Sequence, residues 1–174
     1  MRLFLNALGF QTAWWACIAG LGHGLEIPAL LYGLTLAGLH TAYAPKPSQE
    51  IKLAAVALAI GVAIDTVLQA ASVIDFYGWS LAFFSPFWLW LLWVLFAMTL
   101  NASLSFLQTK PLWLSALAGL VFGPLTYYAG AQLGAAYFDG SFIHTAALAL
   151  VWMIALPFLV YMAQQLFTHT KGQP

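Results

Sequence analysis

The sequence predicts an all-α membrane protein, a six-transmembrane-helix bundle with the N-terminus and the C-terminus both in the cytoplasm. The first observation behind this prediction is composition, because 63% of the 174 residues are hydrophobic and only 6% are charged. Soluble domains carry about 25% charged residues, since their surface faces water. Much of the surface of this protein must therefore face lipid, and a single transmembrane domain over residues 1–174 accounts for the whole chain.

The second observation is a series of apolar stretches of about 20 residues, the length that crosses a bilayer. Six stretches qualify: 3–21, 25–42, 51–73, 84–107, 112–133 and 143–167. The first stretch follows Arg2, as in a secretion signal, but it contains Trp14 and Trp15 and no clear cleavage site. We therefore interpret it as a retained helix.

The third observation is the distribution of basic residues. Arg2, Lys46, Lys52, Lys110 and Lys171 all fall on one side of the membrane if there are six spans. The positive-inside rule assigns that side to the cytoplasm. An odd number of spans would put Arg2 and Lys171 on opposite sides, so the charges also support the count of six.

Charge, cysteine content and missing motifs exclude several classes of function. The net charge is zero and there is no basic patch, so we expect no nucleic-acid partner. Cys17 is the only cysteine, and the His23–Glu26 spacing lacks a third ligand, so no metal site is predicted. Hydrolase, metalloprotease and nucleotide-binding motifs are absent. Whether the chain is an enzyme, and which cofactor it would use, stays open.

A polar stripe in the third stretch marks the strongest candidate site. Gly61, Asp65, Gln69 and Ser72 recur at helical spacing on one face. A charge at the bilayer centre costs about 2.5–3.5 kcal/mol on insertion scales, so this face should point inward. No Lys or Arg lies at that depth to pair with Asp65. The carboxyl then either joins helices by hydrogen bonds or serves a ligand, a proton or catalysis.

Depth along the helices groups other residues with Asp65. At 1.5 Å per residue, Asp65 and Tyr127 lie about 21 Å and about 22 Å beyond the cytoplasmic starts of their helices. Gln11 lies near the midplane of the first helix, and Glu26 lies at the outer rim. We therefore expect an outward-facing pocket for a ligand or proton, formed by Asp65, Gln69, Gln11, Tyr127, Trp14 and Glu26.

Two further features predict helix packing. Gly119, Gly123, Gly130 and Gly134 share one face of the fifth stretch, and this pattern is typical of close helix contacts. The alternative is a broken helix that lines a cavity, because Pro124 interrupts the same stretch. In the fourth stretch, Asn101 is predicted to hydrogen-bond between helices.

Short motifs along nearly the whole chain resemble the DUF2878 family. They are Phe10-Gln11-Thr12-Ala13-Trp14, Gly61 to Asp65, Pro86-Phe87-Trp88, Gly123-Pro124, Leu133-Gly134-Ala135 and Trp152 to Pro157. The resemblance implies a small multi-pass protein of the bacterial inner (cytoplasmic) membrane. It implies no catalytic residues, because the family's function is unknown.

Three hypotheses follow from these observations. The first is a protein that binds or moves a small or lipid-like molecule in the pocket around Asp65. The second is a lipid-modifying enzyme that uses Asp65 as acid or base, assisted by Tyr127 or Glu26. The third is a structural protein whose glycine face binds another membrane protein or a second copy of the chain. The lipid bilayer is the one partner common to all three.

Overall fold

The computed structural model describes residues 2–168 and shows an all-α architecture in that part of the chain. Its helices are α1 (Arg2–His23), α2 (Glu26–Ala42), α3 (Pro47–Ala70), α4 (Phe87–Leu100), α5 (Leu112–Gln132) and α6 (Phe142–Thr168). A 3₁₀-helix, η1 (Ser105–Thr109), follows α4. The short strands β1 (Asp75–Phe76) and β2 (Ala136–Tyr137) pair antiparallel.

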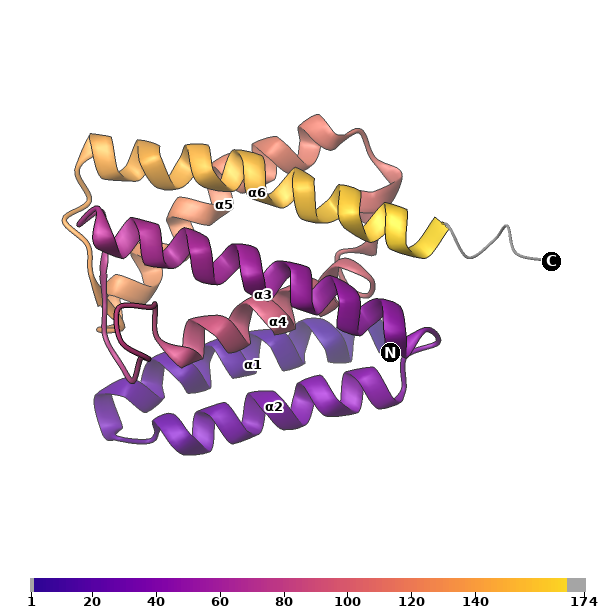
Figure 1. Ribbon diagram of the computed structural model, residues 1–174, viewed down its shortest axis with the longest axis horizontal. Helices are drawn as coiled ribbons and strands as arrows, with labels where there is room; N and C mark the ends of the chain where they lie inside the picture. The colour runs from indigo at the N-terminus through magenta and orange to yellow at the C-terminus, as the bar shows by residue number, and fades with distance from the viewer. Residues whose placement is uncertain (1, 169–174) are drawn as a thin grey trace.

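The helices run between two ends of the bundle (Figure 1). We call the end where α1 begins and α6 finishes the terminal end, and the end that holds β1 and β2 the ladder end. The helices α1 and α2 pair on one side, α5 and α6 pair on the other, and α3 and α4 lie between them.

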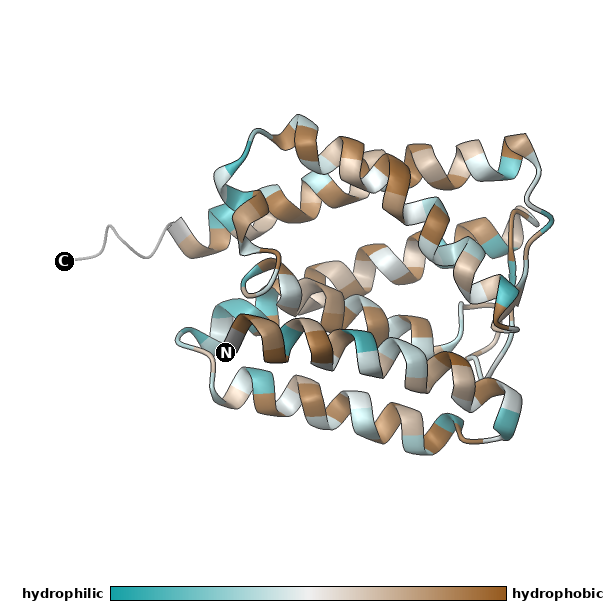
Figure 2. Cartoon of the chain, turned by 180° about the vertical axis from the view of Figure 1, so that it is seen from behind, coloured by the Kyte–Doolittle hydropathy of each residue, from teal (hydrophilic) through white to brown (hydrophobic). Residues whose placement is uncertain are grey.

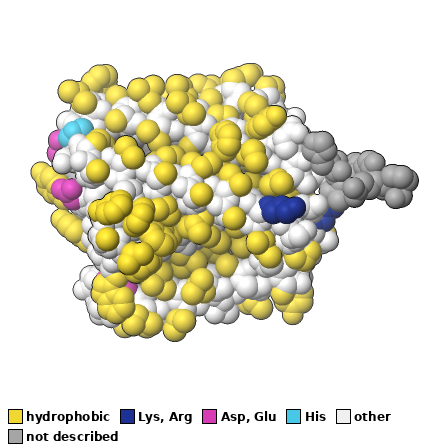
Figure 3. All heavy atoms as spheres, viewed as in Figure 1, with side chains coloured by type: hydrophobic (Ala, Val, Ile, Leu, Met, Phe, Trp, Pro, Cys, Tyr) yellow, Lys and Arg dark blue, Asp and Glu magenta, His cyan; other side chains and the backbone are white. Residues whose placement is uncertain are grey.

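Three helices in the described part are long and apolar enough to cross a membrane: α3, α5 and α6. The helix α4 is apolar but spans only 14 residues. Hydrophobic residues recur along every helix in Figure 2. In Figure 3, apolar side chains are spread over the whole visible face, acidic groups gather near the ladder end, and basic groups lie near the terminal end. The chain is thus a helical protein with candidate membrane spans. Lys171 and the side chain of Arg2, used above for orientation, lie outside what the structure describes.

The helix limits differ from the predicted stretches at α3 and α4. The helix α3 begins at Pro47 rather than Ile51, because proline suits the first turn of a helix. It ends at Ala70, shortly before Ser72, whose φ is +55°. The helix α4 ends at Leu100 rather than Leu107. Asn and Ser side chains compete with helical hydrogen bonds there, and turns and η1 replace the last predicted turns.

Gly134 does not share a helix face with the other three glycines, because α5 has already ended at Gln132. Its φ is +86°, and the backbone N–H of Ala135 donates to the carbonyl of Gly130 at 3.0 Å. The N–H of Gly134 donates to the carbonyl of Ala131, also at 3.0 Å. These two bonds and the left-handed glycine form a Schellman motif, so Gly134 terminates α5.

Candidate functional site

Asp65 lies at the centre of a buried cluster that joins α3, α4 and α5. Its side chain is fully buried. The indole Nε1 of Trp93 donates to one carboxyl oxygen at 2.7 Å. The hydroxyl of Tyr127 donates to the other oxygen at 2.5 Å. Both partners are neutral donors, so the carboxyl is held by hydrogen bonds and not by an ion pair.

Two glycines let the helices approach closely enough to form this cluster. The rings of Trp93 on α4 and Trp152 on α6 stack with centroids 4.8 Å apart and an interplanar angle of 7°. A Cβ at Gly61 would lie 2.1 Å from the Trp93 ring, and a Cβ at Gly123 would lie 2.3 Å from the Trp152 ring. The stacked indoles therefore fill the space that the two missing side chains leave between α3 and α5. This layer sets the position of the Trp93 donor that binds Asp65.

A cavity of about 430 Å³ lies beside this cluster, between α1, α4, α5 and α6. Trp14, Trp93, Phe96, Tyr127 and Trp152 supply aromatic rings to its walls, and most of the remaining lining is aliphatic. Asp65 does not line the cavity, because Trp93 and Tyr127 stand between. The carboxyl therefore holds two side chains of the cavity wall by hydrogen bonds without lining the cavity itself.

The cavity is a groove that opens sideways. The helix α5 lines it from Ala118 to Ala131, which is a length of about 20 Å at 1.5 Å per residue. At the ladder end, a Cβ on Gly130 would meet the tip of the Ile18 side chain of α1 at 3.7 Å, so this side chain narrows the groove there. Toward the terminal end, the lining residues Phe106 and Phe122 are 55% and 62% exposed. We call this cavity the lateral groove.

The structure brings together only part of the predicted pocket. Asp65 and Tyr127 bond to each other, and Trp14 joins Tyr127 in the lateral groove. Gln69 lies one turn beyond Asp65, is half-buried, and its Oε1 has no hydrogen-bond partner.

Gln11 and Glu26 lie apart from this cluster. Gln11 is exposed, because Phe10, Trp14 and Ile18 form the face of α1 that lines the groove. The Oε2 of Glu26 accepts a hydrogen bond from the backbone N–H of Trp79 at 2.9 Å, so Glu26 anchors the connection between α3 and α4. Of the six residues expected to form one outward-facing pocket, Gln11 and Glu26 therefore lie apart from the groove along the side of the bundle.

Two glycines of α5 pack closely against α6. A Cβ at Gly119 would lie 2.1 Å from the backbone carbonyl oxygen of Trp152, and Gly123 packs against the ring of the same residue. These two glycines belong to the α5–α6 contact, and together with Gly130 they also line the lateral groove.

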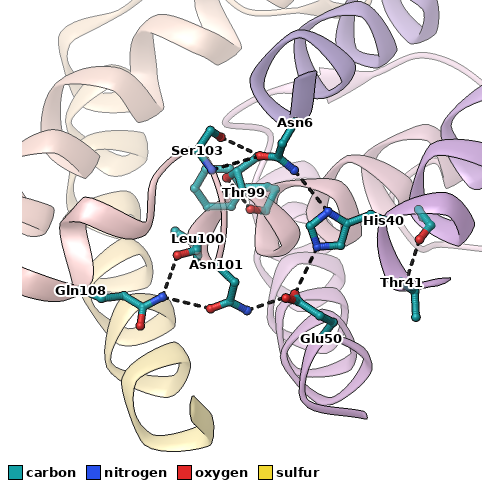
Figure 4. A network of polar contacts seen from close by, with 11 residues as sticks. Asn6, His40, Thr41, Glu50, Thr99, Leu100, Asn101, Ser103 and Gln108 are labelled. Atoms are coloured by element: carbon teal, nitrogen blue, oxygen red, sulfur yellow. Dashed lines mark hydrogen bonds and ion pairs between the residues drawn. The ribbon is translucent and has the colours of Figure 1, made fainter. Parts of the chain in front are cut away.

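The sequence interpretation missed a polar network at the terminal end, which Figure 4 shows. Glu50, in the first turn of α3, is only 4% exposed. Its Oε2 accepts a hydrogen bond from Nδ2 of Asn101 at 3.1 Å and lies 3.4 Å from Nε2 of His40. Asn101 therefore does join helices, as an amide that binds a carboxylate. One sequence signal was available, because Glu50, Gly61 and Asp65 recur on the buried face of α3.

Among the described residues, no three His, Cys, Asp or Glu side chains are grouped so that they could hold a metal ion. Neither curated proteins nor solved structures gave a match to this chain. The sequence model of DUF2878, described as a protein of unknown function, matches residues 3–158. Because this match covers most of the chain, the protein belongs to the DUF2878 family.

Proposed function

We propose that this chain crosses the bacterial inner membrane six times, with both ends in the cytoplasm, and holds one lipid-like chain in the lateral groove. The long apolar helices and the apolar surface support the membrane location. The basic residues Lys46, Lys52 and Lys110 all lie at the terminal end, next to the α2–α3 connection or the start of α5. The positive-inside rule then puts this end in the cytoplasm.

The observation that carries the ligand proposal is the sideways opening of an apolar, aromatic-walled groove. A volume of about 430 Å³ is in the range of small-molecule sites, which is about 300–1,000 Å³. Its length of about 20 Å exceeds one leaflet of the hydrocarbon core, which is about 15 Å. A molecule already dissolved in the bilayer, such as an acyl chain, reaches this groove without crossing water. Asp65 serves this site by holding Trp93 and Tyr127 in place.

A lipid-modifying enzyme is the second candidate, and the position of Tyr127 favours it. Tyr127 lines the groove and at the same time donates a hydrogen bond to Asp65. The proton of this hydrogen bond is therefore carried by a side chain that a bound lipid-like chain would contact. In this second candidate, Asp65 acts on the ligand through the Tyr127 hydroxyl.

Photolabelling tests the binding proposal. The full chain is reconstituted in nanodiscs with a long-chain alcohol that carries a photoactivatable diazirine, and the labelled residues are identified by mass spectrometry. We expect label on the groove residues of α1 and α5. Ala118→Phe fills the groove and should remove this label. The matched variant Leu117→Phe adds the same ring at an exposed position outside the groove and should keep it.

Several results would contradict the proposal. Label spread evenly over the exposed faces of the helices would show that the groove has no preference for the chain. Equal groove labelling in the two variants would show that the alcohol does not need the free volume of the groove to bind. Crosslinks between two copies of the protein across the groove would show that a protein surface occupies it instead.

A further inference from the structure

The buried carboxylate of Glu50 has no cationic partner among the described side chains. His40 alone is within ion-pair distance, at 3.4 Å. The Nζ of Lys46 points to the backbone carbonyl of Phe167 at 3.4 Å, and Lys52 is exposed. A buried carboxylate with only neutral donors is costly, so the protonation state of His40 decides how well Glu50 is stabilised.

The hydrogen bonds of Asn6 bear on which ring nitrogen of His40 carries the proton (Figure 4). The backbone N–H and the hydroxyl of Ser103 both donate hydrogen bonds to Oδ1 of Asn6, at 3.2 and 2.7 Å. This orientation leaves Nδ2 of Asn6 to donate to Nδ1 of His40, 3.4 Å away. An Nδ1 that accepts carries no proton, so this orientation of Asn6 favours the tautomer with its proton on Nε2, the nitrogen that lies 3.4 Å from Glu50.

We propose that the His40–Glu50 pair is a proton-binding site open to the aqueous phase at the terminal end, and that binding of a proton loosens the groove wall at that end. The second half of this proposal rests on the proposed function of the groove. The proton binds to Nδ1 of His40, and the resulting imidazolium pairs with the Glu50 carboxylate.

Protonation changes the bonding of Asn6. A protonated Nδ1 is a donor and faces the Nδ2 donor of Asn6, so the Asn6 amide must turn. The turned amide then presents Nδ2 to the backbone N–H of Ser103, which is also a donor. At least the bond from the Ser103 N–H to Asn6 is lost, and with it a direct link between α1 and the segment 101–109.

The same segment forms the terminal end of the lateral groove. Leu104, Phe106 and Leu107 line the groove and lie between the two polar attachments of the segment. One attachment is the Asn6–Ser103 pair. The other is Gln108, whose Nε2 donates to the carbonyl of Leu100 at 2.7 Å and whose carbonyl accepts from Nε2 of Gln164 at 2.7 Å. Losing the Ser103 N–H bond weakens the first attachment, while the Gln108 contacts and the Asn101–Glu50 bond remain, so the groove can widen on the Ser103 side.

The described side chains from other elements that face the pair carry no charge. Among the described residues, Asn6 on α1 faces His40 and Asn101 after α4 faces Glu50, and both are amides without a charge. A hollow of about 330 Å³ between α1, α2 and α4 touches Asn6, His40 and Tyr43. This hollow provides a path by which a proton reaches the ring.

Hydrogen–deuterium exchange of the segment 101–109 tests the proton site without any ligand. The full chain in nanodiscs is compared at about pH 5 and about pH 8, on either side of the ordinary histidine range. Rates are corrected for the intrinsic pH dependence of amide exchange. We expect roughly five- to tenfold faster exchange at the lower pH, which corresponds to the loss of one hydrogen bond.

The variant His40→Gln should abolish this response. Its amide can donate to Glu50 and accept from Asn6, but it does not bind a proton near neutral pH. His144→Gln, a histidine outside the network, is the matched control and should keep the full response. Glu50→Gln removes the charge that stabilises the imidazolium, so it should shift the midpoint of the exchange transition to lower pH. This second variant decides the question if His40→Gln does not fold.

An unchanged exchange rate between the two pH values, a response that persists in His40→Gln, or an unshifted midpoint in Glu50→Gln would overturn the proton site. Photolabelling with the diazirine alcohol, whose charge does not depend on pH, separates this proposal from the previous one. Groove labelling that is equal at both pH values, with a normal exchange response, refutes the coupling alone. Absence of groove labelling at both pH values refutes the proposed function, while the exchange result still reports on the proton site.

Discussion

Replacing Asp65 by asparagine tests whether the buried carboxyl holds the two aromatic donors. The carboxyl accepts from Trp93 through one oxygen and from Tyr127 through the other. Asparagine keeps one acceptor and places an NH₂ group against the second donor, so one buried donor loses its partner. That loss costs about 1–3 kcal/mol in proteins generally. Hydrogen bonds between membrane helices average about 0.6 kcal/mol and reach about 1.7 kcal/mol. We therefore expect Asp65→Asn to lower the free energy of unfolding by about 1.5 kcal/mol.

A double-mutant cycle with Tyr127→Phe makes this expectation specific. Phenylalanine removes the hydroxyl but keeps the ring, so the single variant should lose about 0.6–1.7 kcal/mol. In the double variant, the NH₂ group of the introduced asparagine no longer faces a donor, and the combined loss should be smaller than the sum by about 1 kcal/mol. Unfolding is followed by circular dichroism during titration with denaturing detergent.

The control for this cycle is Asp75→Asn in the exposed connection, which should change the free energy of unfolding by less than about 0.5 kcal/mol. A loss in Asp65→Asn no larger than in this control would refute the reasoning. Strictly additive losses in the double variant would refute the direct bond between Asp65 and Tyr127.

Two further predictions concern the ends and contacts of α5 and α6. Gly119→Ala places a Cβ 2.1 Å from the backbone oxygen of Trp152 and should destabilise the protein by about 1–3 kcal/mol in the same titration. Gly38→Ala, where no atom lies within 4 Å, should instead be neutral or gain up to about 1 kcal/mol. Before α6, the Ser141 backbone N–H and then the His144 ring hold the pKa of Asp139 below its ordinary value. Its contribution is present above about pH 4 and is lost as the pH falls through the lowered folded pKa. Amide exchange at the start of α6 should therefore rise at acid pH, and Asp139→Asn should remove that rise.

The parts of the fold that local patterns determine could be predicted from the sequence. The six helices and the family resemblance are confirmed. The burial of Asp65 could be predicted because exposing a charge to lipid is costly. That cost depends only on the residue and its neighbours along one helix, which the sequence contains. The predicted end of the fourth helix at Leu107 was wrong. Apolar residues continue up to Leu107, and they conceal the break that Asn101 and Ser103 introduce after Leu100.

The candidate site depends on distances between helices, which periodicity does not contain. The pairing of Asp65 with Trp93 needs α3 and α4 to approach at Gly61, and the groove needs α1 and α5 to stay apart along part of their length. Glu50 was overlooked because it follows a polar connection and looked like part of it. Only the position of His40 and Asn101 in space distinguishes a buried carboxylate from a solvated one.

The parallel indoles of Trp93 and Trp152 have a practical consequence for studying this molecule. Two stacked chromophores with centroids 4.8 Å apart and nearly parallel planes are close enough for their excited states to interact. One belongs to α4 and the other to α6, so any displacement between the two sides of the bundle alters their overlap. The near-ultraviolet spectrum of the purified, unlabelled protein therefore reports on the relative position of α4 and α6, without any attached dye.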